Sequence, residues 1–256
     1  MSKSKRQEMR EKRRRQQRNQ RIMVIGLVAV GVLLIAAAVI LPQLKPIGTV
    51  ATVESFARPN PDGNGTGDPN APILIEVFSD FQCPYCARYS ETTEQQLIDA
   101  FVTPGTVYYR YRSMGNFLSD NIAKSGGASD TESQDAAAAA YCAGDQNKFW
   151  EYHDTLFANQ TGEGVGDFTP RKLTAYAEAV GLDMNAFQSC FDSGKYRDRV
   201  KQDGIDGAAA GVTGTPSFQL TWTVNGQAKH KLVVGAQTID VFQQEIEAAL
   251  AEINQQ

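Results

Sequence analysis

ILIEVFSDFQCPYC, residues 73–86, joins a short apolar run to two cysteines that lie three positions apart. Residues 73–78 are rich in large apolar side chains and carry a single charge, which is typical of a strand buried on both faces. After the second cysteine, Leu97, Ile98 and Phe101 recur at helical spacing. The sequence therefore predicts a strand, a Cys-Pro-Tyr-Cys motif and a helix, in that order.

Two cysteines at the start of a helix predict a redox-active pair. Free backbone N–H groups and the helix dipole stabilise a thiolate at Cys83, and Cys86 follows one turn later, close enough for a disulfide. Pro84 suits the first turn, where an N–H would have no partner. Zinc would need four ligands, and the sequence offers no second cysteine pair and only His153 and His230. We therefore expect no metal, and no cofactor besides the Cys83–Cys86 disulfide.

The chain beyond this motif mixes strand and helix patterns. We expect strands at 106–112, 217–224 and 231–234 and a closing helix at 238–252. Asn225-Gly226 is a typical hairpin turn between the last two strands. Helical patterns fill the chain from about residue 114 to 211, where Ser129 and Glu132 have the spacing of a capping box before an alanine-rich helix.

A membrane-spanning helix is predicted near the N-terminus. Residues 22–41 carry no charge, and a helix of this length spans about 30 Å, one hydrocarbon core. Residues 1–21 hold ten Lys or Arg and two Glu, so the positive-inside rule places this basic tail in the cytoplasm and the chain beyond residue 41 outside. A cleaved signal peptide is the alternative because Ala36-Ala37-Ala38 resembles a cleavage site, but the apolar run continues past it.

The rest of the chain is acidic. Residues 42–256 hold fifteen Lys or Arg against twenty-seven Asp or Glu, a balance that argues against nucleic-acid binding. Residues 42–72 contain six prolines and the stretch DGNGTGDPN, which predicts a linker over 42–71. A folded domain is expected over 72–254.

The motif FSDFQCPYC, residues 78–86, together with GTPSF at 214–218 before a later strand, resembles the DsbA-like branch of the thioredoxin superfamily in its membrane-anchored bacterial form. The resemblance covers about residues 70–252. It implies an α/β thioredoxin fold with an inserted α-helical domain at about 114–211, preceded here by a single transmembrane helix.

The resemblance also assigns roles to residues around the cysteines. It implies a cis-proline at Pro216 beside the disulfide, with Thr215 and Pro216 contacting substrate and Tyr85 offering an aromatic contact to a client protein. The alternative for Thr215-Pro216 is the plain start of an edge strand. DsbA-like proteins often keep a buried acid on the strand before the cysteines. Glu76 is the candidate for this proton-handling role, although an ungapped match places Val77 at that position.

Two further cysteines, Cys142 and Cys190, fall in the helical insertion. Some relatives carry a second disulfide there, and an extracytoplasmic compartment favours a structural bond between these two residues. Two buried thiols or a redox relay are the alternatives.

The resemblance implies an oxidoreductase that introduces disulfide bonds into exported client proteins. A client thiolate attacks the oxidised pair at the more exposed Cys83, and Cys86 can resolve stalled adducts. A quinone-linked membrane protein, DsbB-like or related to vitamin K epoxide reductase, is implied as the reoxidant. Two alternatives stay open: an extracytoplasmic reductase or disulfide isomerase, and a non-catalytic, membrane-tethered peptide-binding module.

Overall fold

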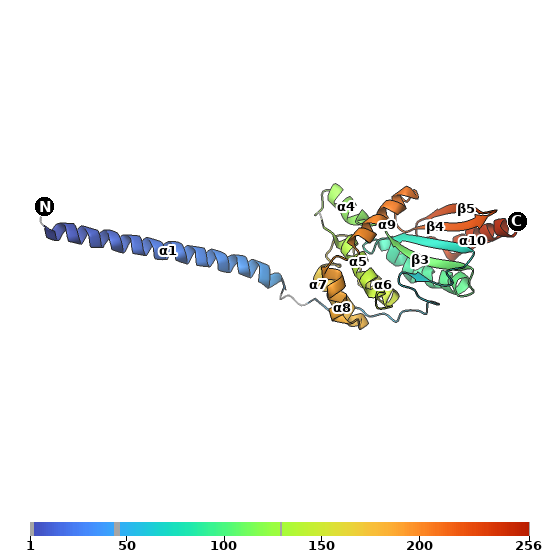
Figure 1. Ribbon diagram of the computed structural model, residues 1–256, viewed down its shortest axis with the longest axis horizontal. Helices are drawn as coiled ribbons and strands as arrows, with labels where there is room; N and C mark the ends of the chain where they lie inside the picture. The colour runs from blue at the N-terminus through green and yellow to red at the C-terminus, as the bar shows by residue number, and fades with distance from the viewer. Residues whose placement is uncertain (1–2, 44–46, 129, 256) are drawn as a thin grey trace. The chain divides into compact units, whose positions relative to one another are not determined.

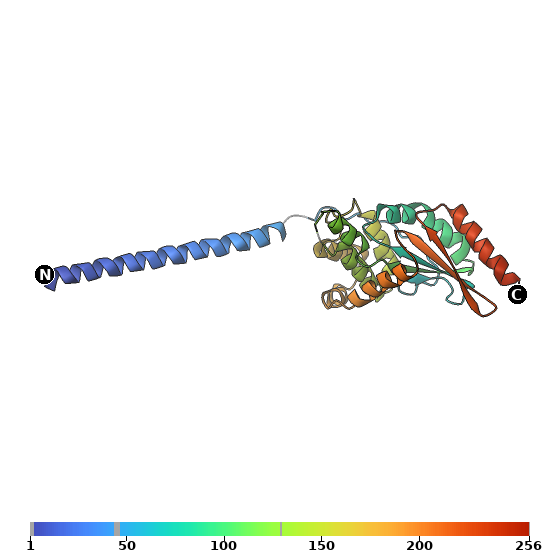
Figure 2. The same cartoon turned by 90° about the horizontal axis from the view of Figure 1, so that it is seen from above.

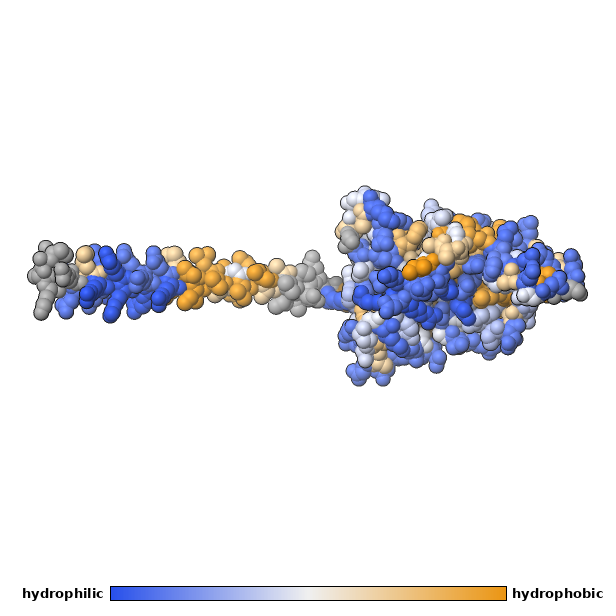
Figure 3. Space-filling view, turned by 45° about the horizontal axis from the view of Figure 1, so that its top comes forward, coloured by the Kyte–Doolittle hydropathy of each residue, from blue (hydrophilic) through white to orange (hydrophobic). Residues whose placement is uncertain are grey.

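The computed structural model describes residues 3–43, 47–128 and 130–255, which form two separate units. The first unit contains one long helix, α1, from Lys3 to Gln43. It includes both the basic tail and the apolar run expected at 22–41, and Figure 3 shows its hydrophilic part giving way to a hydrophobic part. Among the described residues, α1 is the one helix long and apolar enough to cross a membrane.

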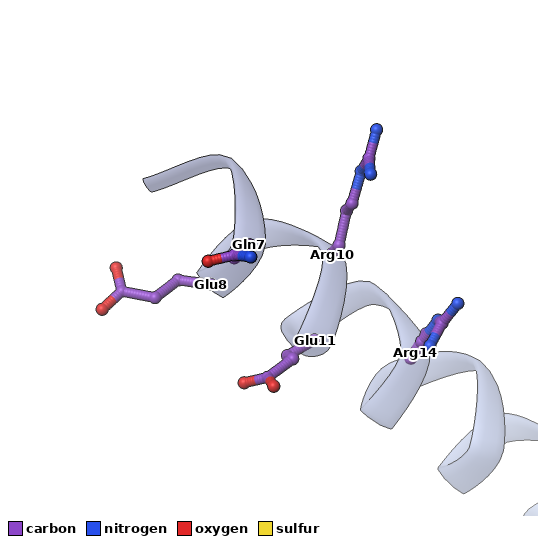
Figure 4. A pocket seen from close by; sticks show the side chains of 5 residues that line it. All are labelled: Gln7, Glu8, Arg10, Glu11 and Arg14. Atoms are coloured by element: carbon purple, nitrogen blue, oxygen red, sulfur yellow. The ribbon is translucent and has the colours of Figure 1, made fainter. Parts of the chain in front are cut away.

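The basic end of α1 carries charges of both signs. Gln7, Glu8, Arg10, Glu11 and Arg14 line a shallow hollow on this helix (Figure 4). The two carboxylates project away from the two guanidinium groups, and all five side chains are exposed. This hollow therefore has no buried polar group with which to select a ligand.

The second unit begins at Thr49 and is built on a mixed five-stranded sheet in the order β1-β3-β2-β4-β5 (Figure 1). The strands are β1 (Gly65–Thr66), β2 (Ile73–Ser79), β3 (Val107–Ser113), β4 (Ser217–Val224) and β5 (Gln227–Val234). β2 and β3 are parallel, and the other neighbouring strands are antiparallel. The expected hairpin is present, and both Asn225 and Gly226 have the positive φ that its tight turn requires.

Helices cover both faces of this sheet (Figure 2). On one face, a helical segment starts at Pro84 and packs beside α10 (Ile239–Asn254), with the Tyr89 ring 5.9 Å from that of Phe242. This segment consists of α2 (Pro84–Tyr89), the π-helical turn η1 (Ser90–Glu94), α3 (Gln95–Leu97) and the π-helical turn η2 (Ile98–Val102). On the other face, α9 (Arg197–Ala209) lies so close that a Cβ at Gly207 would come within 2.9 Å of the Phe78 ring.

The helical insertion lies between β3 and β4 and ends with α9. Its other helices are α4 (Phe117–Lys124), α5 (Glu132–Gly144), α6 (Phe149–Ala158), α7 (Pro170–Val180) and α8 (Met184–Asp192). The alanine run at 136–140 is buried in α5, where its small side chains let α6, α7, α8 and α9 all contact this helix. Ser129 lies outside the described residues. The N-cap of α5 is Thr131, so Glu132 is the first helical residue and not the third as a capping box requires.

Much of the predicted linker is part of the folded unit. β1 lies within it and pairs with β3 at the edge of the sheet. Ala51 exchanges two hydrogen bonds with the side chain of Asn159 on the insertion. The Arg58 guanidinium is buried and forms ion pairs with Glu94 of η1 and Asp154 of α6. Residues 49–58 therefore connect the helical segment that starts at Pro84 to the insertion.

Candidate functional site

The two cysteines occupy the end of the sheet where β2 leads into α2. Cys83 is the N-cap of α2, Pro84 is the first helical residue, and Cys86 lies in the first turn. Both cysteines are free thiols, and they are 3% and 2% exposed, respectively. In this dithiol form the exposures of the two cysteines differ by only 1%. The two residues differ in their electrostatics.

The surroundings of the two thiols push their pKa values apart. The hydrogen bond from the Cys86 thiol, helped by the backbone N–H groups of Cys86 and Tyr85, lowers the pKa of Cys83 to about 7. Burial raises the pKa of Cys86 well above its usual value. Near neutral pH Cys83 is therefore divided between thiol and thiolate, whereas Cys86 keeps its proton.

The loop before β4 lies against this cysteine pair. The Thr215–Pro216 peptide bond is cis, and the Cys83 thiol donates a hydrogen bond to the Thr215 carbonyl oxygen at 3.3 Å. Pro216 is buried while Thr215 is half-buried. Tyr85 is 58% exposed, and the Arg88 guanidinium lies 5.0 Å from its ring centre. The structure thus brings together the residues expected for cysteine chemistry and for substrate contact.

Glu76 lies apart from this group. Its carboxylate forms ion pairs with Arg112 at 2.9 Å and with Arg110 at 3.8 Å, and Arg112 also binds Asp203 of α9. Adjacent strand residues point to opposite faces of a sheet, and the next residue, Val77, belongs to the core that contains Cys86. Glu76 is therefore on the wrong face of the sheet to exchange a proton with Cys86, which corrects the expectation.

The structure reveals a buried acid that sequence reasoning missed. Asp80, in the loop between β2 and Cys83, is 2% exposed, and burial raises the pKa of its carboxyl group to about 6. Its carboxylate oxygens accept hydrogen bonds from the backbone N–H groups of Gln82 and Leu118. An aspartate three positions before Cys83, next to the apolar run at 73–78, was the available signal.

The other two cysteines are joined in the insertion. Cys142 of α5 and Cys190 of α8 form a disulfide with an S–S distance of 2.03 Å. Cys142 is buried, and Cys190 is partly exposed near the carboxylate of Asp145. This bond links two helices of the insertion and contributes no group to the Cys83 site.

One group of possible metal ligands is present among the described residues. Glu94, His153 and Asp154 bring a ligand atom each within 4.8 Å of one another. The Arg58 guanidinium binds both carboxylates, and the His153 ring packs against Phe81 and Phe157. An arginine therefore already balances the acidic charge of this cluster.

Comparison with known proteins identifies the fold. A family model described as thioredoxin matches residues 60–248, which is most of the chain. The chain belongs to the thioredoxin family. Among solved structures, the oxidised form of BdbD from Bacillus subtilis aligns with a TM-score of 0.60 and 18% identity over 78% of this chain and 100% of BdbD. The α-DsbA1 protein of Wolbachia pipientis aligns with a TM-score of 0.61 and 18% identity over 77% of this chain and 94% of α-DsbA1. The DsbA-like thioredoxin fold is thereby confirmed.

Two relatives show how this thioredoxin-family domain occurs elsewhere. The Na⁺/H⁺ antiporter NhaA 1 of Salinispora arenicola is 32% identical over 72% of this chain and 24% of the antiporter. A provisionally named protein-disulfide oxidoreductase of Rickettsia felis is 25% identical over 82% of this chain and 66% of that protein. The chain spans about a quarter of the length of the antiporter relatives that it matches.

Proposed function

We propose that this protein is a membrane-anchored thiol-disulfide oxidoreductase that introduces disulfide bonds into exported proteins through Cys83 and Cys86. The observation that carries the proposal is the contact between the low-pKa thiol of Cys83 and the carbonyl oxygen of Thr215, beside a cis-proline. The name of the Rickettsia felis relative and the DsbA-like fold support the same activity.

The proposed reaction transfers two electrons from the client to the cysteine pair. A client thiolate attacks the Cys83 sulfur of the oxidised pair, a mixed disulfide forms, and Cys86 leaves and takes up a proton. The second client thiolate then attacks the client sulfur of the mixed disulfide and displaces Cys83 as a thiolate. The client leaves with a new disulfide, and the pair is left as the dithiol. No cofactor beyond the disulfide is needed.

The electrostatics of the site favour this direction. A thiol of low pKa is a good leaving group, and a stabilised thiolate favours the reduced pair, which makes its disulfide an oxidant. The substrate side has a matching geometry. The Thr215 backbone, half-exposed beside Cys83, can pair with an extended client segment that flanks the client cysteine.

The reduction potential of the pair tests the direction. Residues 47–256 are equilibrated with glutathione buffers, and the oxidised fraction is measured by trapping. A potential of about −120 to −180 mV supports a disulfide donor. A potential near that of thioredoxin, about −270 mV, contradicts the oxidase and supports the reductase alternative.

Single cysteine variants test the mechanism. We expect Cys83→Ala to abolish oxidation of a reduced client and Cys86→Ala to accumulate mixed disulfides, which non-reducing electrophoresis detects. Full activity in either variant would contradict the mechanism. The protein would instead be a peptide-binding module if the native form oxidises no client and the double variant Cys83→Ala, Cys86→Ala binds clients as well as the native form does.

The proposal places the catalytic domain outside the cytoplasm. The basic tail and α1 support a single-pass anchor with a cytoplasmic N-terminus, and a quinone-linked membrane protein of the DsbB or vitamin K epoxide reductase type is the proposed reoxidant. A membrane-impermeant maleimide applied to intact cells should label reduced Cys83. Labelling only after the membrane is broken would overturn this orientation.

A further inference from the structure

The side chain that immediately precedes Cys83 is fully hydrogen-bonded to the helical insertion. Gln82 is 1% exposed. Its amide nitrogen donates to the hydroxyl oxygens of Ser119 in α4 at 2.8 Å and Ser133 in α5 at 2.9 Å. Its amide oxygen accepts from the N–H of Gly164 at 2.8 Å. One side chain therefore joins the active-site loop to three segments of the insertion.

The backbone around Gln82 is held equally firmly. Its N–H donates to the Asp80 carboxylate at 3.0 Å, and its carbonyl oxygen accepts from the Gln160 side chain at 2.7 Å. The N–H of Cys83 donates to the Asp80 carbonyl oxygen at 2.9 Å. The peptide group between Gln82 and Cys83 is therefore fixed at both its C=O and its N–H.

The orientation of this peptide group determines where the Cys83 sulfur lies. The sulfur must meet the Thr215 carbonyl oxygen on one side and the Cys86 thiol and first N–H groups of α2 on the other. No bond from the thioredoxin sheet reaches the Gln82 side chain among the described residues; its partners all lie in the insertion. The insertion thus holds the side chain of the residue next to Cys83.

We propose that Gln82 is a positioning residue that lets the helical insertion fix the orientation, and thereby the reactivity, of Cys83. The proposal deepens the proposed function and rests on it for the role of Cys83 as the attacked sulfur. Through Gln82 the insertion would influence the reactivity of Cys83, in addition to any contact that it makes with clients.

The test uses the full chain in detergent micelles and the variant Gln82→Met, which keeps the side-chain length and removes its hydrogen bonds. We expect the thiol pKa of Cys83, measured by thiolate absorbance, to rise. The rate constant for alkylation by iodoacetamide at neutral pH should fall about fivefold, because the thiolate fraction falls. A native pKa and a native rate in a folded variant would overturn the proposal.

The control separates positioning from stability. Trp150→Phe removes another buried hydrogen bond between the insertion and the sheet, from the indole N–H to the Gly65 carbonyl oxygen at 3.2 Å. Among the described hydrogen bonds of Gln82, none involves Trp150 or Gly65. We expect it to lower the unfolding midpoint and leave the Cys83 pKa unchanged. An equal pKa shift in Trp150→Phe would show a general loosening and overturn the specific role.

A second variant decides the matter if Gln82→Met does not fold. Gln160→Ala removes only the bond to the Gln82 carbonyl oxygen, from a partly exposed side chain. It should shift the Cys83 pKa in the same direction, and a native pKa and rate would overturn the proposal. Neither readout involves a client protein. A protein that fails to oxidise clients but shows these shifts therefore refutes the oxidase function and retains the positioning role.

Discussion

At the scale of single residues, the cysteine pair is asymmetric because of its surroundings. Cys83 and Cys86 are almost equally buried, yet the pKa of Cys83 is lowered to about 7 and that of Cys86 is raised. The largest cause at Cys83 is the hydrogen bond from the Cys86 thiol, ahead of the N–H groups of the helix. The second cysteine therefore tunes the first in addition to forming the disulfide with it.

This asymmetry predicts a pH profile. Alkylation of the reduced protein by iodoacetamide should proceed at Cys83 with a midpoint near pH 7, and Cys86 should stay unmodified. Cys86→Ala removes the largest stabilising hydrogen bond, so the midpoint should move to higher pH. The modified residue is identified by mass spectrometry. An unmoved midpoint in Cys86→Ala would mean that Thr215 and the helix N–H groups stabilise the thiolate without the Cys86 thiol.

The raised pKa of Asp80 predicts that the free energy of unfolding also depends on pH. Its folded-state pKa of about 6 exceeds the ordinary value of 3.8, so between these values the unfolded chain releases a proton that the folded chain keeps. The free energy of unfolding should therefore fall as the pH rises through this window, by up to about 3 kcal/mol, and level off above it.

Urea unfolding across the pH series measures this effect. Asp80→Asn cannot titrate, so the stability of the native protein relative to this variant should decline from about pH 4 to about pH 6. A stability difference that stays constant over this range would contradict the assignment to Asp80.

The cysteines and the proline loop could be predicted at this scale because their chemistry depends on residue type and local position. The position of Cys83 at a helix start, and that of Pro216 just before a strand, can each be recognised from the neighbouring sequence. The roles of Glu76 and Asp80 depend on which face of the sheet or loop each side chain occupies, and a one-residue shift reverses that face. The side-chain hydrogen bonds of Gln82 reach residues 37 to 82 positions away, which no local pattern reveals.

At the scale of elements, the active-site helix is held by an arginine from the segment before the sheet. Arg58 pairs with Glu94 at 3.0 Å and with Asp154 at 2.8 Å, and its guanidinium also lies over the rings of Phe56 and Trp150. The side chains of Arg58 and Glu94 are almost completely buried, and Arg58 is the cationic partner in both ion pairs.

Arg58→Met should therefore be severely destabilising. Removal of one member of a buried ion pair typically costs about 3–5 kcal/mol, because the remaining charges are left buried. Lys148→Ala is the matched control, since its pair with Glu151 at 3.7 Å is exposed and should contribute less than about 1 kcal/mol. Chemical denaturation measures both. Equal losses in the two variants would show that residues 49–58 do not anchor the helix.

The disulfide between α5 and α8 predicts a change in stability without a change in chemistry. It closes a loop with a sequence separation of 48, so the double substitution Cys142→Ala, Cys190→Ala should lower the free energy of unfolding by about 2–4 kcal/mol. The alkylation rate of Cys83 should be unchanged. A loss of Cys83 reactivity in this variant would favour the redox-relay alternative.

Strands and helices were predictable where a pattern repeats, as in β2, the 217–234 hairpin and α10. The linker was not, because prolines and glycines at 59–70 indicate turns without indicating whether the turns are packed. Arg58 and β1 become structural only through partners in η1, α6 and β3. The start of α5 at Glu132 was also misread, since a capping box is a local pattern that neighbouring residues can override.

At the scale of the whole molecule, the two units have opposite charge and separate internal contacts. Residues 47–256 should therefore fold without α1, remain soluble, and keep both the unfolding midpoint and the Cys83 pKa of the full chain. Thermal unfolding and alkylation check this. Aggregation of residues 47–256, or a shifted Cys83 pKa, would show that α1 is needed for the fold of the domain.

The strand order has a consequence for how the molecule is made. β2 pairs on one side with β3, and on the other side with β4, which is synthesised only after the whole insertion. Until β4 has been made, one edge of β2, the strand that leads to Cys83, has no partner strand. The carbonyl oxygen that accepts the Cys83 hydrogen bond belongs to Thr215, 132 positions downstream, and is also made late. From residue 86 to residue 224 the growing chain thus carries an uncovered dithiol, and other thiols and disulfides can reach that dithiol before its own fold buries it.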